Sequence, residues 1–132
     1  MGAWGHRSFE NDDAADWLSD LVSGNTLEPV QSAFNEAPGN EEYIEIDSGS
    51  RIIAAGQVVA LLRGMPAQSL PERLTAWHDA HQLTVDDTLL EQAVRAVKSV
   101  HDTSELREVW EDVSSIEGWE QDVLDLLSRL QA

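Results

Sequence analysis

The run from Ile52 to Leu62 constrains the fold more strongly than any other part of the chain. As a helix, it would be apolar almost all the way round. Such a helix has to be enclosed by other elements, and it is too short to span a bilayer, which takes about 20 apolar residues. We therefore predict a central helix that opens at Ser48 or Ser50. Gly56 lowers the helix propensity of this segment by about 1 kcal/mol relative to alanine. Because glycine has no side chain, its presence here indicates that a neighbouring helix crosses closely at this position.

Amphipathic helical patterns account for most of the remaining chain. The first begins at a capping residue, Asn11 or Asp12, and ends at Gly24. Five more show apolar positions at helical spacing, over residues 26–37, 69–81, 84–100, 102–113 and 114–130. Tyr43–Asp47 alternates weakly, and we interpret it as a packed connector because a lone strand cannot form a sheet. The sequence thus predicts an all-α fold: a single compact bundle of about seven short to medium helices around residues 52–62, in one domain over residues 1–132.

Capping residues set the expected starts of the later helices. Thr26 precedes the second helix, and Thr84 or Asp86 precedes the fifth. Two segments match a capping box, in which a serine and a glutamate three residues later satisfy free backbone N–H groups. These segments are Ser69-Leu70-Pro71-Glu72 and Ser114-Ser115-Ile116-Glu117.

Four of the five tryptophans fall on apolar helical stripes. This position predicts that they pack in the core with their indole N–H groups at its edge. They are Trp17, Trp77, Trp110 and Trp119. Trp4 belongs to no predicted helix. It either folds into a groove on its own domain, which is the preferred interpretation, or stands exposed as an anchor for a partner.

The charge is large and unevenly distributed, with a formal net value of −17. Residues 1–50 carry 11 acidic residues against one arginine, residues 101–132 carry nine against two, and residues 51–100 hold five of each sign. An acidic surface repels phosphate, so no nucleic-acid partner is predicted. It would attract a basic protein partner. The simpler interpretation, that the acidity only confers solubility, stays open.

Several chemistries are excluded by residues and motifs that the sequence lacks. The absence of cysteine excludes disulfides, thiolate catalysis and cysteine-ligated zinc. The sequence has no glycine-rich phosphate loop and no Gly-x-Ser-x-Gly elbow, and we predict no cofactor. It also has no signal-peptide pattern and no run long enough to cross a membrane, so the expected location is the cytoplasm, with no membrane partner.

The opening 17 residues combine three large aromatics, two glycines around Trp4 and a run of acids, which is unusual for a chain terminus. Capping and the helix dipole account for the acids. The alternative is a small hydrolase or metal-dependent enzyme that uses His6, Glu10, Asn11, Asp12 and Asp13. The candidate binding residues of this segment are Trp4, His6, Phe9, Glu10, Asn11, Asp12, Asp13 and Asp16.

The other histidines have a simpler interpretation. His78 and His81 share a helix face and could form a metal pair, but no His-Glu-x-x-His motif accompanies them. His81 and His101 each fall near the end of a predicted helix, where a cation favours the helix dipole. We therefore predict no metal site.

The segments Met1-Gly-Ala-Trp4-Gly5 and Phe9-Glu10-Asn11-Asp12 closely resemble the start of a bacterial family known as domain of unknown function 4259. Its members typically begin M-G-A-W-G-x-G-x-F-[DE]-N-D. The resemblance continues through residues 52–62, 104–111 and 119–130. It implies a small, single-domain bacterial protein and supplies no activity. The chain departs from the family at Arg7, where a glycine is usual, and at Gly56, where an acid is frequent.

The preferred functional hypothesis is a non-enzymatic, acidic, cytoplasmic protein-binding domain. Small acidic bacterial proteins of this kind include immunity proteins and antitoxin-like partners that cover basic surfaces, and the comparison is by class only. A third interpretation is purely structural: the opening motif caps the first helix and seals the core.

Overall fold

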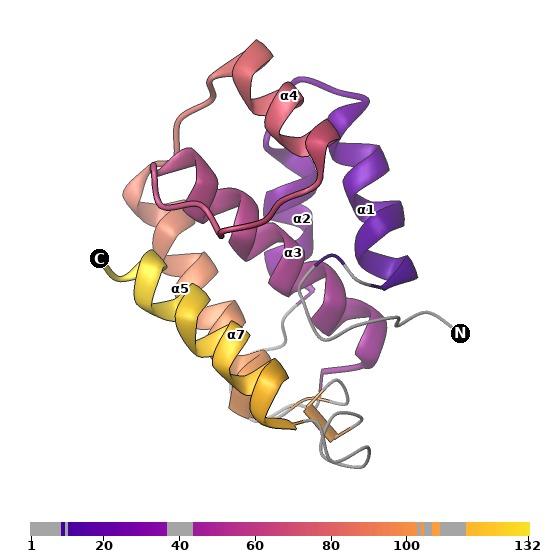
Figure 1. Ribbon diagram of the computed structural model, residues 1–132, viewed down its shortest axis with the longest axis vertical. Coiled ribbons are helices and arrows are strands. Elements are labelled where there is room, and N and C mark those ends of the chain that lie inside the picture. The colour runs from indigo at the N-terminus through magenta and orange to yellow at the C-terminus, as the bar shows by residue number, and fades with distance from the viewer. Residues whose placement is uncertain (1–8, 10, 37–43, 103, 105–106, 109–115) are drawn as a thin grey trace.

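The computed structural model describes residues 9, 11–36, 44–102, 104, 107–108 and 116–132. Over these residues the fold is all-α, as predicted, with six helices rather than seven (Figure 1). The remaining predicted helix, over residues 102–113, lies mostly outside the described residues. None of the described helices is long and apolar enough to cross a membrane. The helices are α1 (Asp12–Val22), α2 (Glu28–Asn35), α3 (Ile46–Leu62), α4 (Glu72–His81), α5 (Asp87–Asp102) and α7 (Ile116–Leu130).

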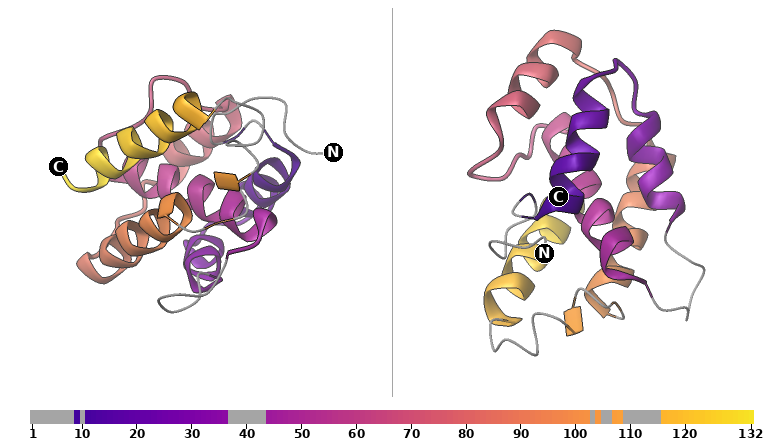
Figure 2. Two further views of the ribbon diagram at one scale, coloured as in Figure 1. Left: turned by 90° about the horizontal axis from the view of Figure 1, so that it is seen from below. Right: turned by 90° about the vertical axis from the view of Figure 1, so that its right-hand side faces the viewer.

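Helix α3 lies at the centre of the bundle, which confirms the prediction from its apolar sequence. Every residue from Ile52 to Leu61 is buried. Helices α1 and α2 pack on one side of α3, and α5 and α7 pack on the other (Figures 1 and 2). Helix α4 packs against α1. The buried apolar side chains of these elements form one continuous cluster, so α3 links both halves of the bundle.

Gly56 marks the closest approach between α3 and its neighbours. A Cβ atom at this position would lie 2.8 Å from Val97 Cγ2 on α5 and 3.1 Å from Leu126 Cδ2 on α7. Carbon atoms in ordinary contact are about 3.5–4.0 Å apart. The predicted close crossing is therefore confirmed. The acid that is frequent here in the family that the sequence resembles would not fit unless both neighbours moved.

The described tryptophans pack as predicted. Trp17, Trp77 and Trp119 are at most 6% exposed. The indole N–H of Trp17 donates to the carbonyl oxygen of Pro29 at 3.2 Å, and that of Trp77 donates to the carbonyl oxygen of Gly24 at 2.8 Å. The first bond ties α1 to the first turn of α2, and the second ties α4 to the loop between α1 and α2. Trp4 and Trp110 lie outside the described residues.

Two predicted caps are confirmed. The side chain of Asn11 accepts a hydrogen bond from the backbone N–H of Ala14 at 2.8 Å, which caps α1. The side chain of Asp86 accepts one from the backbone N–H of Leu89 at 2.8 Å, at the start of α5. At α2 the N-cap position is Leu27, and the Thr26 hydroxyl, one residue earlier, accepts from the backbone N–H of Glu28 at 3.3 Å. The predicted box at residues 114–117 lies mostly outside the described residues.

Two predicted helix starts are wrong. Helix α3 begins at Ile46 rather than after Ser48 or Ser50, because the chain enters the helix directly from the buried Ile44. The Ser48 hydroxyl donates instead to Glu36 at 2.9 Å. Helix α4 begins at Glu72 with Pro71 as its cap and no side-chain capping bond, so the predicted role of Ser69 is also wrong.

Candidate functional site

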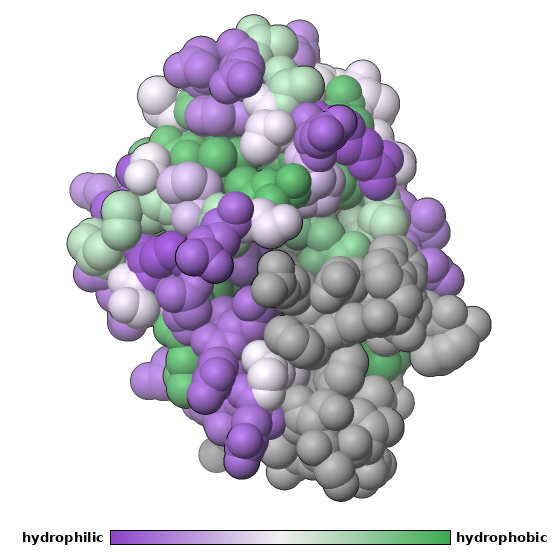
Figure 3. Space-filling view, in the orientation of Figure 1, coloured by the Kyte–Doolittle hydropathy of each residue, from purple (hydrophilic) through white to green (hydrophobic). Residues whose placement is uncertain are grey.

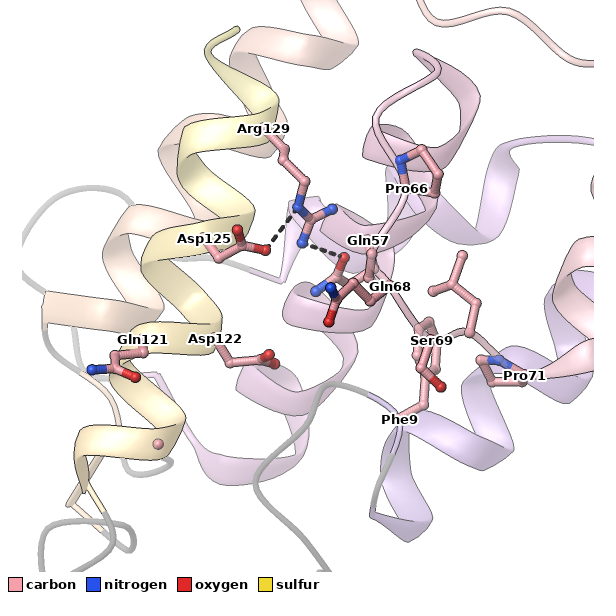
Figure 4. Close-up of a pocket in the computed structure, with 13 residues that line it drawn as sticks. Phe9, Gln57, Pro66, Gln68, Ser69, Pro71, Gln121, Asp122, Asp125 and Arg129 are labelled. Atoms are coloured by element: carbon pink, nitrogen blue, oxygen red, sulfur yellow. Dashed lines mark hydrogen bonds and ion pairs between the residues drawn. The ribbon is translucent and has the colours of Figure 1, made fainter.

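A groove of about 800 Å³ runs between α7 and the connection from α3 to α4 (Figure 4). The α7 wall presents one polar stripe, because its members recur every three or four residues and so share a helix face. The stripe consists of Gly118, Gln121, Asp122, Asp125 and Arg129. The opposite face of α7 buries Trp119, Val123, Leu126 and Leu130 in the core. The same helix therefore anchors itself in the core and offers a hydrophilic wall to the groove.

The facing wall is the connection over residues 66–71, which contributes Ala67, Gln68, Ser69 and Leu70 together with its two prolines. Proline fixes the backbone φ angle, so the first and last positions of this wall have little conformational freedom. Phe9, from the opening motif, lines the groove on the same side (Figure 4). In the space-filling view, hydrophobic surface lies in the hollow between hydrophilic flanks (Figure 3). One wall is thus predominantly apolar and the other is polar.

Arg129 connects the walls of the groove. Its Nε–H donates to Asp125 Oδ2 at 2.9 Å, Nη1 donates to the carbonyl oxygen of Met65 at 3.0 Å, and Nη2 donates to Gln57 Oε1 at 3.0 Å. Gln57 is 3% exposed and comes from α3. The Arg129 side chain is only 12% exposed, whereas that of Asp125 is 64% exposed. The guanidinium group therefore fixes the positions of α7, α3 and the connection relative to one another, and the Asp125 carboxylate stays accessible to solvent.

A second polar network fixes the other end of α7. His101 lies between two carboxylates: Nδ1 is 2.8 Å from Asp102 Oδ1, and Nε2 is 2.8 Å from Glu120 Oε2. Donation to both requires a hydrogen on each ring nitrogen. Arg107 Nη1 lies 3.3 Å from the same Glu120 oxygen. The hydrogen bond from His101, more than the one from Arg107, lowers the pKa of the Glu120 carboxyl below its ordinary value. The His101 ring also stacks on Trp119, with centroids 6.3 Å apart.

The predicted residues of the opening segment are only partly described. Phe9 is half-buried and lines the groove. Asn11 is occupied as the α1 cap, Asp12 and Asp16 are exposed on α1, and Asp13 is half-buried. Trp4, His6 and Glu10 lie outside the described residues. The described part of the chain thus brings Phe9 to the groove and places the described acids along α1.

The histidine pair on α4 shows no ligand geometry. His81 donates its Nδ1–H to the carbonyl oxygen of Trp77 at 2.8 Å, at the last turn of the helix. Within the part of the chain that the structure describes, no group of three or more His, Asp or Glu side chains is placed to hold a metal ion.

A known family matches this chain over residues 2–122, and its description is "Domain of unknown function (DUF4259)". The chain belongs to the DUF4259 family. The family match includes Phe9, the connection over residues 66–71 and the first half of α7, which together form most of the groove, whereas Asp125 and Arg129 lie beyond it. No curated protein and no solved structure matches the chain. The DUF4259 assignment confirms the resemblance of the sequence to this family.

The groove was missed in the sequence because its walls come from distant segments. One signal was present: the polar positions 121, 122, 125 and 129 form a stripe opposite the apolar face of the last helix. Because Ser69 was predicted to cap a helix, the connection over residues 66–71 was not predicted to form the other wall of a groove. In the DUF4259 structure Ser69 faces the groove instead.

Proposed function

We propose that this chain is a non-enzymatic protein-binding domain of the bacterial cytoplasm, comparable to immunity or antitoxin-like proteins, and that it holds a basic protein partner in this groove. The observation that carries the proposal is that a residue of the opening motif and acidic residues of α7 line the same groove. Phe9, from the motif most specific to the family, shares one concave surface with the carboxylates of Asp122 and Asp125. Concave surfaces with a few convergent polar groups are the usual sites of recognition.

Electrostatics supports a basic partner. The net charge of −17 produces an attractive field for cationic surfaces, and such fields raise association rates. Among the described residues that line the groove, the guanidinium group of Arg129 already donates to Asp125, Gln57 and Met65. The Asp125 carboxylate remains 64% exposed, so a cationic side chain that enters the groove can reach it.

The test compares two variants with equal changes in charge. Asp122→Asn with Asp125→Asn neutralises the groove, and Asp12→Asn with Asp16→Asn neutralises two exposed acids on α1. The tagged chain is used to capture proteins from the source cell, and the captured protein is then purified and titrated against each variant. We expect a basic partner whose affinity falls with added salt and falls further in the groove variant than in the α1 variant.

Two outcomes would contradict the proposal. Equal weakening in both variants would mean that the general acidity of the surface, and not the groove, attracts the partner. Retention of no basic protein by the wild-type chain at low salt would remove the proposed function altogether.

A further inference from the structure

We infer that the outer seam between α5 and α7 is a second interaction surface, which binds an acidic amphipathic helix of a partner protein. The seam consists of six side chains along the line where the two helices meet: Leu90, Val94, Arg95 and Lys98 on α5, and Leu124 and Leu127 on α7. It is separate from the groove and does not depend on the proposed function. Its apolar floor, its unpaired cations and its dimensions support the inference.

Helices α5 and α7 lie side by side and run antiparallel (Figures 1 and 2). At one end, Leu90 of α5 and Gln131 of α7 line the same hollow of about 460 Å³. At the other end, His101 of α5 is bonded to Glu120 of α7 at 2.8 Å. Both helices rise by about 1.5 Å per residue, so residues at equal steps from these two ends stay level with one another.

The floor of the seam is apolar. Leu90, Val94 and Leu127 are partly buried and pack against the core, whereas Leu124 is 46% exposed. The two leucines of α7 are three residues apart and the two apolar residues of α5 are four apart, so each pair shares a helix face. In the antiparallel arrangement, Val94 lies level with Leu127. Single exposed apolar residues are common on protein surfaces, whereas contiguous ones mark sites of interaction.

The cations beside this floor have no partner of their own. Within the described part of the chain, the side chains of Arg95 and Lys98 take part in no hydrogen bond or ion pair. Every other arginine that the structure describes donates to a carboxylate, a hydroxyl, an amide or a carbonyl. Arg95 and Lys98 are both exposed and lie one turn apart. On a chain of net charge −17, this is a local surface of the opposite sign.

Charge and apolar contact contribute differently to binding. Ion pairs at an exposed surface add little affinity, but they select the partner and its orientation. The affinity comes from the apolar side chains that are removed from water. A ligand that satisfies both requirements carries an apolar face with carboxylates beside it.

Glu91 sets the orientation of the ligand. It is exposed, lines the hollow at one end of the seam and would repel a carboxylate there. Arg63, at the same end, is already engaged, because its Nη1 donates to the carbonyl oxygen of Leu130 at 3.0 Å. The carboxylates of the ligand therefore belong beside Arg95 and Lys98.

The dimensions of the seam favour a helix as the ligand. From Leu90 to Lys98, α5 rises about 12 Å, which is about two turns. A helix presents apolar side chains at positions i, i+3 or i+4 and i+7 over such a length. An extended strand would need backbone partners, and the helices of the seam bond their backbone groups internally. A small anion would fill the hollow near Leu90 and leave Leu124 uncovered.

The probes are three fluorescein-labelled, alanine-rich peptides of about 18 residues, long enough to form helices. The first carries leucines on one face with glutamates beside them. The second has the same composition, but its leucines are scattered around the helix. The third replaces each glutamate of the first by glutamine.

Binding to the full chain is measured by fluorescence polarisation in about 0.15 M salt, which screens charges more than about 8 Å away. The contact surface is mapped from backbone amide shifts in NMR spectra. We expect the first peptide to bind about tenfold more tightly than the other two and to shift amides of α5 and α7. Absence of binding, equal affinity for any two of the peptides that include the first, or shifts confined to other helices would overturn the inference.

Variants test the floor and the cations separately. Leu124→Gln and Lys98→Gln should each weaken binding of the first peptide, by about fivefold or more. The matched controls are Met65→Gln, at the other exposed large apolar residue of the described chain, and Arg73→Gln, at an exposed cation of α4, and both should bind as the wild type does. Glu91→Gln should strengthen binding. Circular dichroism verifies folding, and wild-type affinity in both seam variants would refute the inference.

Other occupants give different results. If the seam binds a second copy of the chain, sedimentation velocity shows a dimer that Leu124→Gln abolishes. If it binds a small amphipathic anion, an equal concentration of decanoate displaces the first peptide. Either result would overturn the inference.

The tests of the seam and of the groove have independent outcomes. The Asp122→Asn, Asp125→Asn chain should bind the first peptide with wild-type affinity, because these residues line the groove and not the seam. Loss of peptide binding in that chain would contradict the location of the site on the seam. Capture of a basic partner, or its absence, bears on the groove alone.

Discussion

The replacement Gly56→Ala tests the central three-helix contact. The new methyl group would lie 2.8 Å from Val97 Cγ2 and 3.1 Å from Leu126 Cδ2, both shorter than an ordinary contact. Extra atoms in a packed core cost about 1–3 kcal/mol. The change also improves helix propensity by about 1 kcal/mol. The expected net effect is a loss of up to about 2 kcal/mol in the free energy of unfolding.

A double-mutant cycle with Val97→Ala isolates the contact from the propensity effect. Val97→Ala alone leaves a cavity beside Gly56 and should cost about 1–3 kcal/mol, since each buried methyl group removed costs about 0.5–1.5 kcal/mol. In the double variant the alanine methyl group at position 56 occupies part of that cavity. We expect the two effects to fall short of additivity by about 1 kcal/mol or more, in urea unfolding followed by circular dichroism.

The refuting results are specific. If the two changes add within about 0.5 kcal/mol, positions 56 and 97 do not contact each other. If Gly56→Ala alone raises stability by the full propensity gain, the methyl group finds open space, and the described approach of α3 to α5 and α7 is wrong.

Three further predictions concern single contacts. Gly64 has a φ angle of +81° with no atom within 4 Å of an added Cβ, so Gly64→Ala should lower stability by about 1 kcal/mol and Gly64→Asn by less, in thermal melts. Trp77→Phe replaces a buried indole by a smaller ring and removes the bond to the Gly24 carbonyl, so it should cost about 1–3 kcal/mol in urea unfolding. The depressed pKa of Glu120 makes its network stabilising at pH values above the ordinary 4.5, and this contribution disappears as the pH falls through the folded-state pKa. Glu120→Gln should therefore reduce the fall of Tm with decreasing pH, whereas Glu117→Gln, at an exposed position of the same helix, should leave that fall unchanged. The same dependence of Tm on acidic pH in the wild-type chain and both variants would contradict the stabilising role of Glu120.

Much of the fold was predictable because each helix carries its own periodicity. The apolar run at residues 52–62 required enclosure on all sides, and the tryptophans at positions 17, 77 and 119 lay on apolar stripes that the structure buries. The start of α4 was not predictable in this way. Ser69 and Glu72 match a capping box by spacing alone, but the chain only becomes helical at Glu72.

The candidate site was less predictable because it depends on contacts between distant residues. Arg129 and Gln57 are 72 residues apart, and His101 and Glu120 are 19 apart. Periodicity within one helix carries no information about such pairs. The opening motif did predict Phe9 as a binding residue, although nothing in the sequence indicated that its ring would line a groove formed by α7 and residues 66–71.

The absence of a side chain at Gly56 also affects the outer surface of the molecule. Leu126 meets Gly56 on the inner face of α7, and Asp122 and Asp125 stand on the outer face of the same helix. A bulkier residue at position 56 would push α7 away from α3 and so move both carboxylates relative to the proline-rich wall. The distance across the groove is therefore adjustable from within the core, and a change at a fully enclosed position could alter which ligands the surface accepts without replacing any residue that touches them.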